Sequence, residues 1–449
     1  MVSNGAWMRS APARRARPKR GGAKAAAKPQ SLEQRILLTA TMCLLAFGAV
    51  MVYSASSATT LLQGRGNGSS YLIKYLIYGG VGLAAMRLLA RDGIAKVQSI
   101  TMPLLRVSFV LVAITHVPHI GVSINGARRW LGPSQLQFQP SELLKLALVL
   151  YCAMLLAKRP RRVDDLGDLA KPLLIVVGAG ALLVFTQPDL GTALVMIFSV
   201  VAMLVAAGIP MRNLGRIAAT LAGAIVLYAL VKPYARARLT SFLDPWAHAS
   251  SSGFQAVQGQ IAIGSGGLFG VGPGGSVQKI FYLPEAPTDF ILAVIAEELG
   301  IVGVYALLFL YGLIAYAGLR AARGAKSLYS ALIAVGVTAL ICSQALLNTF
   351  AVLGLAPLTG VPLPFVSYGS SSLIVMLAAM GLLLNVASGA TGHVRAVRPS
   401  RRAAADARDG RRRETEGWGG ERSAEDRDRS RRHGGARGAG AGRRGRAAG

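Results

Sequence analysis

Long apolar stretches alternate with short polar connections along most of the chain, and this pattern sets the expected architecture. A membrane-spanning helix needs about 20 mostly apolar residues. Stretches of this kind lie at roughly 35–56, 71–90, 100–118, 141–157, 172–187, 190–209, 215–232, 290–318, 328–352 and 366–387. The pattern predicts an all-α polytopic membrane protein with about ten transmembrane helices.

Basic residues in the connections predict the orientation, because cytoplasmic loops carry an excess of Lys and Arg. One set of connections holds Arg91, Lys96, the run KRPRR (158–162), Arg212, Arg216, Arg320, Arg323 and Lys326. The opposite set holds Arg65, Arg128, Arg129, Lys232, Arg236, Arg238 and Lys279. We expect the first set and both termini to be cytoplasmic, in a multi-pass protein of the cytoplasmic (inner) membrane.

The longest connection, residues 233–289, lies between the seventh and eighth predicted helices and is expected to be extracytoplasmic. It is rich in Gly and shows little clear secondary structure. Loops of this length are usually functional or disordered. Its apolar positions and the run GGLFG (266–270) suggest that it packs against, or dips into, the membrane face.

Composition supports a membrane protein, since 53% of residues are hydrophobic and 15% are charged, against about 25% charged in soluble domains. The net charge of +29 could suggest nucleic-acid binding, but the basic residues concentrate at the two ends. We interpret residues 1–34 and 391–449 as disordered cytoplasmic tails around a membrane domain at 35–390. The tails are expected to contact anionic membrane lipid, and no nucleic-acid partner is expected.

Seven carboxylates stand out because they lie in the outer loops, at the outer membrane boundary or within a span, where acids are costly and often functional. They are Glu142, Asp189, Asp244, Glu285, Asp289, Glu297 and Glu298. Glu142 suits the first turn of a helix and equally suits a functional role, and Lys145 is its expected partner three residues on. Asp189 follows Pro188 in a tight turn and is interpreted as structural.

Two interpretations of Asp289 remain open from the residues alone. It precedes a predicted span, so it could cap that helix or act as a base at the outer membrane surface. Glu297 and Glu298 lie roughly 12–13 Å further along the same helix, at 1.5 Å per residue. They point in different directions around the helix, so we expect them to be buried and paired internally.

The outer basic residues are candidate phosphate ligands. Arg128 and Arg129 stand together beside Trp130, and a pair of Arg can bind phosphate bidentately. Lys279 follows a Gly-rich segment whose amides could also face an anion. His116 and His119 lack an evident third ligand, so no metal site is predicted from the residues.

Six motifs occur in order from the third predicted span to the tenth. They are NGARRWLG (125–132), FQPSELLK (138–145), QPDLGTA (187–193), GFQAVQGQIAIGSGGLFGVG (253–272), SVQKIFYLPEAPTDFILAVIAEELG (276–300) and PLTGVPLPFVSYGSSS (357–372). With these motifs the chain resembles the SEDS family (shape, elongation, division and sporulation), the membrane polymerases of peptidoglycan. Residues 125–132 and 276–300 are more similar to the FtsW cell-division branch than to the RodA elongation branch.

The resemblance implies a glycosyltransferase that polymerises lipid II. The growing glycan, held on undecaprenyl pyrophosphate, would be the donor and lipid II the acceptor. The family has an essential Asp in a Thr-Asp-Phe motif, which corresponds to Asp289, so the resemblance favours the functional interpretation of that residue. The matched motifs add Gln278, Glu285 and Ser367 as candidate substrate-binding residues.

The chain departs from the family pattern at two positions near these motifs. Pro287 stands where members commonly have His or Gln before Thr-Asp. Ser370 replaces the second Gly of Ser-Tyr-Gly-Gly-Ser-Ser. The first is expected to alter the loop before Asp289, and the second places a side chain at a position of close packing.

The expected mechanism is an inverting single displacement in which Asp289 takes the proton of the acceptor hydroxyl, a form of general base catalysis. Candidates for holding the leaving pyrophosphate are Arg128, Arg129, Lys279 and Arg238, with or without a divalent ion such as Mg or Mn. Glu142 and Lys145 are expected to order the cavity beneath.

The resemblance further implies a class B penicillin-binding protein transpeptidase as partner, together with other division proteins and a location at the septum. Three alternatives are a lipid II flippase, a RodA-like elongation polymerase and a non-catalytic scaffold for division proteins. A flippase should carry charges through both leaflets, whereas the carboxylates named above cluster in the outer half of the predicted spans.

Overall fold

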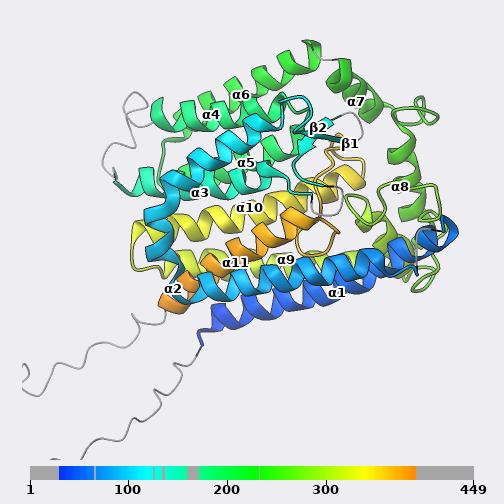
Figure 1. Ribbon diagram of the computed structural model, residues 1–449, viewed down its shortest axis with the longest axis horizontal. Coiled ribbons are helices and arrows are strands. Elements are labelled where there is room, and N and C mark those ends of the chain that lie inside the picture. The colour runs from blue at the N-terminus through cyan, green and yellow to red at the C-terminus, as the bar shows by residue number, and fades with distance from the viewer. Residues whose placement is uncertain are drawn as a thin grey trace, which may run out of the picture. The chain divides into compact units, whose positions relative to one another are not determined.

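A computed structural model of the chain describes residues 30–64, 67–124, 127–133, 137–158, 171–231 and 233–390. The proposed C-terminal tail and nearly all of the N-terminal tail lie outside these residues. Within them the chain is almost wholly helical (Figure 1). The helices are α1 Leu32–Leu62, α2 Ser70–Ile114, α3 Pro140–Lys158, α4 Lys171–Phe185, α5 Leu190–Ala206, α6 Met211–Val231, α7 Pro233–Leu243, α8 Phe254–Gly266, α9 Ile291–Arg323, α10 Leu328–Val352 and α11 Ser370–Ala390.

Among the described residues, seven helical segments are long and apolar enough to cross a membrane. They are α1, two segments of α2, and α3, α9, α10 and α11. The shorter apolar helices α4 and α5 match two further predicted spans, and α6 matches the seventh. The all-α membrane fold is thus confirmed, while the count of ten spans and their orientation stay predictions.

The second and third predicted spans form one continuous helix, which the sequence pattern did not indicate. The polar stretch at 91–96 keeps helical hydrogen bonding, so α2 runs for 45 residues. Its apolar segments, Ser70–Arg91 and Lys96–Ile114, are each long enough to span a bilayer. Figure 1 shows α2 changing direction near its middle, so one helix supplies both spans.

Three helices form the centre of the bundle. In the most apolar windows of α3, α10 and α11, 78%, 67% and 72% of residues are buried, against 28% for each segment of α2 and for α9. A membrane protein hides its polar groups in the interior, because lipid offers them no hydrogen bonds. The buried polar side chains of α3 and α10, including Lys145 and Gln344, therefore lie where the protein can satisfy them.

The long connection before α9 contains two helices, so the prediction of little secondary structure there was wrong. Helix α7 covers Pro233–Leu243 and α8 covers Phe254–Gly266. Both are short and only weakly apolar, which is why hydropathy did not reveal them. The strands β1 (Val122–Ile124) and β2 (Ala127–Trp130) form a small antiparallel hairpin, and Figure 1 shows it at the same end of the bundle as α7 and α8.

Helix α9 is broken at Gly300, whose φ of 66° lies in the left-handed region that favours glycine. The carbonyls of Glu297 and Glu298 accept hydrogen bonds from the amides of Val271 and Gly272, at 2.9 and 3.0 Å. The amides of Ile301 and Val302 donate to the carbonyls of residues 267 and 268, at 3.0 and 3.2 Å. The segment 267–272 therefore packs against the break, as the GGLFG run suggested.

Candidate functional site

Asp289 lies in the turn before α9, and neighbouring elements hold its backbone from two sides. The Asn348 side chain on α10 donates to the carbonyl of Asp289 at 2.7 Å and to that of Val361 at 2.8 Å. The amide of Tyr368 donates to the carbonyl of Pro287 at 2.9 Å. The turn is therefore fixed to both the end of α10 and the segment before α11.

The Asp289 side chain lines a cavity of about 460 Å³ at this end of the bundle. The walls come from the β1–β2 hairpin, α7, α8, the turn before α9 and the segment from 360 to 372. Its lining includes Arg129, Trp130, Gln139, Arg238, Gln255, Glu285, Thr288, Pro362, Tyr368 and Ser372. Polar and charged side chains from distant parts of the sequence thus converge on one carboxylate, as in a typical ligand site.

The environment of Asp289 raises the pKa of its carboxyl group from 3.8 to about 6. Burial is the largest cause, and the neighbouring negative charge of Glu285 adds to it. Hydrogen bonding within the turn, including that from Thr288, and the positive charge of Arg238 act in the opposite direction. Asp289 can therefore be ionised at neutral pH and still have a pKa close to that of an effective proton acceptor.

The Thr288 hydroxyl connects the two carboxylates of the site. Its oxygen lies 3.1 Å from Oδ1 of Asp289, 2.9 Å from Oε2 of Glu285 and 3.0 Å from the Glu285 carbonyl. A hydroxyl carries one proton, so it donates to one of these acceptors at a time. Glu285, predicted to bind substrate, thus lies beside Asp289 in the cavity.

The two adjacent arginines of β2 point to different surroundings. Side chains alternate between the faces of a strand, and Arg129 lines the cavity while Arg128 is exposed and does not. Arg129 donates to the carbonyls of Gln187 and Pro188, and its guanidinium lies 3.8 Å from Asp189. The structure therefore brings only Arg129 of this pair to Asp289.

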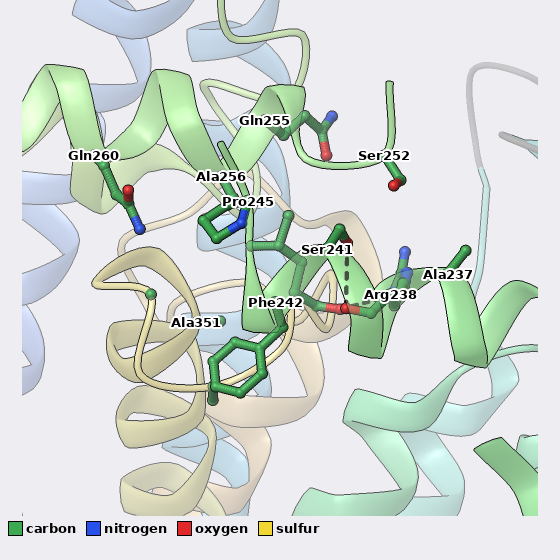
Figure 2. A pocket seen from close by; sticks show the side chains of 13 residues that line it. Ala237, Arg238, Ser241, Phe242, Pro245, Ser252, Gln255, Ala256, Gln260 and Ala351 are labelled. Atoms are coloured by element: carbon green, nitrogen blue, oxygen red, sulfur yellow. Dashed lines mark hydrogen bonds between the residues drawn. The ribbon is translucent and has the colours of Figure 1, made fainter. Parts of the chain in front are cut away.

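Arg238 belongs to two adjoining cavities. It lines the Asp289 cavity and also a smaller one of about 210 Å³ between α7, α8 and the end of α10. Figure 2 shows Arg238 and Ser241 on α7 near Gln255 of α8. One guanidinium nitrogen of Arg238 donates to the Leu358 carbonyl at 2.8 Å, which fixes the side chain at the boundary between the cavities.

Lys279 lies outside the Asp289 cavity, contrary to the expectation that it would face the same substrate. Its ammonium group is buried 2.7 Å from Glu298 and 3.1 Å from the Ser54 hydroxyl of α1. It also donates to the Gly274 carbonyl at 2.9 Å. A buried ammonium needs such partners, and these contacts direct Lys279 to α1 and α9.

The two Glu residues of α9 are buried and paired, as predicted. Glu297 accepts hydrogen bonds from the Ser276 hydroxyl and from the amides of Val277 and Gln278. Glu298 pairs with Lys279. Gln278 thus contributes its backbone to this cluster, and its side chain is not among the described residues that line the Asp289 cavity.

Glu142 and Lys145 form the expected pair at 2.8 Å, and both are buried. The Lys145 ammonium also donates to Gln344 of α10 at 2.7 Å. The Gln344 amide in turn donates to the Pro362 carbonyl at 2.9 Å and the Ser372 hydroxyl at 3.3 Å. Because Pro362 and Ser372 line the cavity, the pair supports its wall from beneath without lining it itself.

Three further positions have local structural roles. The Ser367 hydroxyl is buried and accepts from the Leu363 amide at 2.8 Å, so the structure gives this predicted substrate ligand a turn-stabilising contact instead. The Ser370 hydroxyl donates to the Gln137 carbonyl at 2.9 Å, so the departure from Gly is accommodated by a hydrogen bond. Pro287 retains its carbonyl contact with Tyr368.

Sequence analysis did not select Gln344 and Asn348, although both support the site. The signal was present, because two amides four residues apart share one face of an otherwise apolar helix. A buried amide in a membrane helix needs partners, and these two find them at the segment around residues 361 and 362.

Replacing Asn348 with leucine tests the support of Asp289. The change keeps the side-chain size but removes two hydrogen bonds to backbone carbonyls. Leaving a buried carbonyl unsatisfied costs about 1–3 kcal/mol. We expect a lower unfolding midpoint and a lower kcat, measured by thermal unfolding and polymerisation assays. Ser343→Ala on the same helix, outside both cavities, is the control; equal loss in both variants would contradict the positioning role.

The fold and site together define a polytopic helical membrane protein with a carboxylate-centred cavity at one end of its bundle. Comparison with known proteins makes this more specific. The family described as cell cycle protein, FtsW/RodA/SpoVE, matches residues 34–391, and the chain belongs to this family.

The relatives cover most of this chain. Stage V sporulation protein E of Bacillus subtilis is 38% identical over 78% of this chain and 96% of its own length. A probable peptidoglycan glycosyltransferase FtsW of Thioalkalivibrio sulfidiphilus is 41% identical over 79% of this chain and 90% of its own length.

Two solved structures share the fold. A chain from a study of how a peptidoglycan synthase complex coordinates polymerisation and crosslinking is 33% identical, with a TM-score of 0.65 over 78% of this chain and 96% of that one. The rod shape determining protein RodA of Thermus thermophilus is 32% identical, with a TM-score of 0.57 over 78% of this chain and 95% of that one.

Proposed function

We propose that this chain is a peptidoglycan glycosyltransferase that polymerises lipid II into glycan strands. The observation that carries the proposal is Asp289, a carboxylate with a raised pKa whose backbone is held by Asn348 in a cavity that also contains Arg129 and Arg238. Several relatives are named peptidoglycan glycosyltransferases, which supports the same reaction.

The reaction joins two lipid-linked sugars, and the site offers a separate task to each charged group. The Asp289 carboxylate takes the proton of the acceptor hydroxyl as its oxygen attacks the anomeric carbon of the donor. The bond from that carbon to undecaprenyl pyrophosphate breaks, the electron pair leaves with the pyrophosphate, and the centre inverts. Arg238 and Arg129 stabilise the charge that develops on the leaving group.

The two adjoining cavities suit a reaction between two large substrates. Arg238 stands at their shared wall, so its charge can act on a pyrophosphate in either compartment. Such fixed cations assist most when they are held in place before the reaction begins. The hydrogen bond to the Leu358 carbonyl provides that preorganisation.

A divalent ion such as Mg or Mn fits the donor set of this cavity. Mg²⁺ is commonly held by one or two carboxylates with the remaining ligands from substrate phosphates and water. Glu285 and Asp289 would supply the carboxylates, and the ion would neutralise charge on the pyrophosphate. No group of three or more His, Cys, Asp or Glu capable of holding a metal occurs among the described residues, so the substrate would complete the site.

We assign the chain to septal wall synthesis during cell division, with a class B penicillin-binding protein transpeptidase as its partner. The relatives named FtsW support the division role. The likeness to a chain from a peptidoglycan synthase complex supports the transpeptidase partner. Imaging a fluorescent fusion in dividing cells tests the location: a septal band is expected, whereas signal confined to the lateral wall would favour the elongation role.

Purified chain reconstituted in vesicles with lipid II tests the activity itself. Glycan strands are the expected product, alone or with the transpeptidase present. Transfer of fluorescent lipid II across the bilayer with no polymer formed would instead support the flippase alternative.

The activity is expected to fall at acid pH, because Asp289 must be ionised to accept a proton. With a pKa of about 6, the rate should rise from pH 5 to pH 7 and then level. Glu285→Gln removes the negative charge that raises this pKa, so the acid limb should move to lower pH. Arg238→Ala removes a charge that lowers the pKa and should move the limb to higher pH. Rates of lipid II polymerisation across pH measure both shifts, and an unmoved limb in both variants would contradict the assignment of Asp289.

A further inference from the structure

A separate cavity of about 660 Å³ lies where α2, α10 and α11 meet. Its polar lining includes Arg91, Gln98, Lys326, Ser327, Tyr329 and Ser330. None of these residues belongs to the Asp289 site, and no described lining residue of this cavity is acidic.

The cavity lies at the opposite membrane face from Asp289. Tyr329 lines it, and Asn348 on the same helix holds Asp289. Nineteen residues separate them, a rise of roughly 29 Å at 1.5 Å per residue, which is close to the hydrocarbon thickness of about 30 Å. In Figure 1 the start of α10 and the end of α11 lie at the other end of the bundle from the β1–β2 hairpin. The bias of Lys and Arg predicts that this face is cytoplasmic.

The lining favours a phosphate group. Arg91 and Lys326 supply two positive charges from different helices. The first turn of α10 contains no acid, and its positive dipole end adds to the attraction for an anion. Tyr329 is 8% exposed, and its hydroxyl makes no hydrogen bond with a described group, so an unsatisfied polar atom lies at the wall.

Hydrogen bonds hold this wall together. The Asn385 side chain of α11 donates to the carbonyls of Ala90 and Arg91 at 2.9 and 3.0 Å. The Ser327 hydroxyl accepts from the Ser330 amide at 3.2 Å and caps α10. The two cation-bearing segments are therefore fixed at their backbones, which lowers the entropy cost of binding a shared anion.

Apolar groups adjoin the charged ones. Ile94 and Val386 contribute to the lining, and Leu328, beside Lys326, is 40% exposed on a membrane-spanning helix. A ligand that satisfies both surfaces carries a phosphate and acyl chains. We propose that this cavity binds the phosphate headgroup of an anionic phospholipid in the cytoplasmic leaflet, bridging α2, α10 and α11; basic pockets between membrane helices on that side are known to take such headgroups.

The test measures lipid binding to the full-length purified chain by native mass spectrometry, with phosphatidylglycerol, phosphatidylcholine and inorganic phosphate as separate probes. Phosphatidylglycerol should bind, and Arg91→Ala with Lys326→Ala should weaken it by about fivefold per cation removed. The control pair, Arg212→Ala with Arg323→Ala, removes the same charge from exposed residues outside the cavity and should change binding less than twofold.

Three results would overturn the proposal: equal weakening in both pairs, equal binding of phosphatidylcholine, or displacement of phosphatidylglycerol by millimolar inorganic phosphate. The first two would indicate non-specific association, and the third a site for small phosphates. The single variant Lys326→Gln, with an expected loss of about fivefold, serves if the double variant unfolds. Because the cavity is separate from Asp289, polymerase activity of any size leaves this test independent of the proposed reaction.

Discussion

Replacing Asp289 with asparagine is expected to lower lipid II polymerisation by about 10²–10⁴-fold, the usual contribution of a general base. The protein should remain folded. The folded-state pKa of Asp289 lies above its ordinary value, so ionising this carboxylate costs stability as the pH rises through about 6. Removing the charge therefore relieves an unfavourable burial at neutral pH. Polymerisation by reconstituted protein, together with its thermal unfolding midpoint, measures both effects.

The matched control for this prediction is Asp244→Asn in the same outer connection. The Asp244 carboxylate accepts a hydrogen bond from the Ala247 amide at 3.0 Å and does not line the Asp289 cavity. Its replacement should leave polymerisation within about twofold, the range of an ordinary surface change. Near-normal glycan synthesis by folded Asp289→Asn would remove Asp289 from the reaction and leave the membership of the family untouched.

Replacing Lys279 with methionine is expected to destabilise the protein by about 3–5 kcal/mol, because it leaves Glu298 as a buried unpaired charge. The same holds for Glu298→Leu. The double variant should recover much of the loss, since removing both partners of a buried ion pair is often close to neutral. Unfolding midpoints of the two single variants and the double variant form a thermodynamic cycle that isolates the interaction.

This cycle also separates two roles for Lys279. If Lys279 held the leaving pyrophosphate, as the sequence suggested, Lys279→Met would be inactive while its unfolding midpoint stayed normal. The buried contact with Glu298 predicts instead that stability falls first and activity follows the folded fraction. Arg128→Met is the control, because Arg128 is an exposed cation on the same side of the bundle; its unfolding midpoint should be unchanged.

Sequence patterns predicted those features that depend on nearby residues or on hydropathy. The apolar spans, the Glu142–Lys145 pair three residues apart and the turn role of Asp189 are of this kind. The pairing of Glu297 and Glu298 followed from the high cost of unpaired buried acids. Family motifs, rather than spacing, selected Asp289 from between two open interpretations.

The remaining features depend on contacts across long stretches of chain. Asn348 reaches the Asp289 carbonyl 59 residues away, and Lys145 reaches Gln344 199 residues away. No local periodicity encodes such pairs. The separation of Arg128 from Arg129 follows from strand formation in a short segment, and the burial of Lys279 follows from the path of a Gly-rich loop. Phosphate-competent chemistry in the sequence therefore does not reveal which cations share a cavity.

The break at Gly300 has a consequence for how this region can assemble. The backbone groups freed by the break are satisfied by residues 267–272, and lipid could not replace those hydrogen bonds. Helix α9 therefore cannot reach its final form as an independently inserted hairpin partner of α10. It has to close onto a segment made some thirty residues earlier in the chain, so an insertion in that outer loop should disturb membrane insertion of α9 as well as the loop itself.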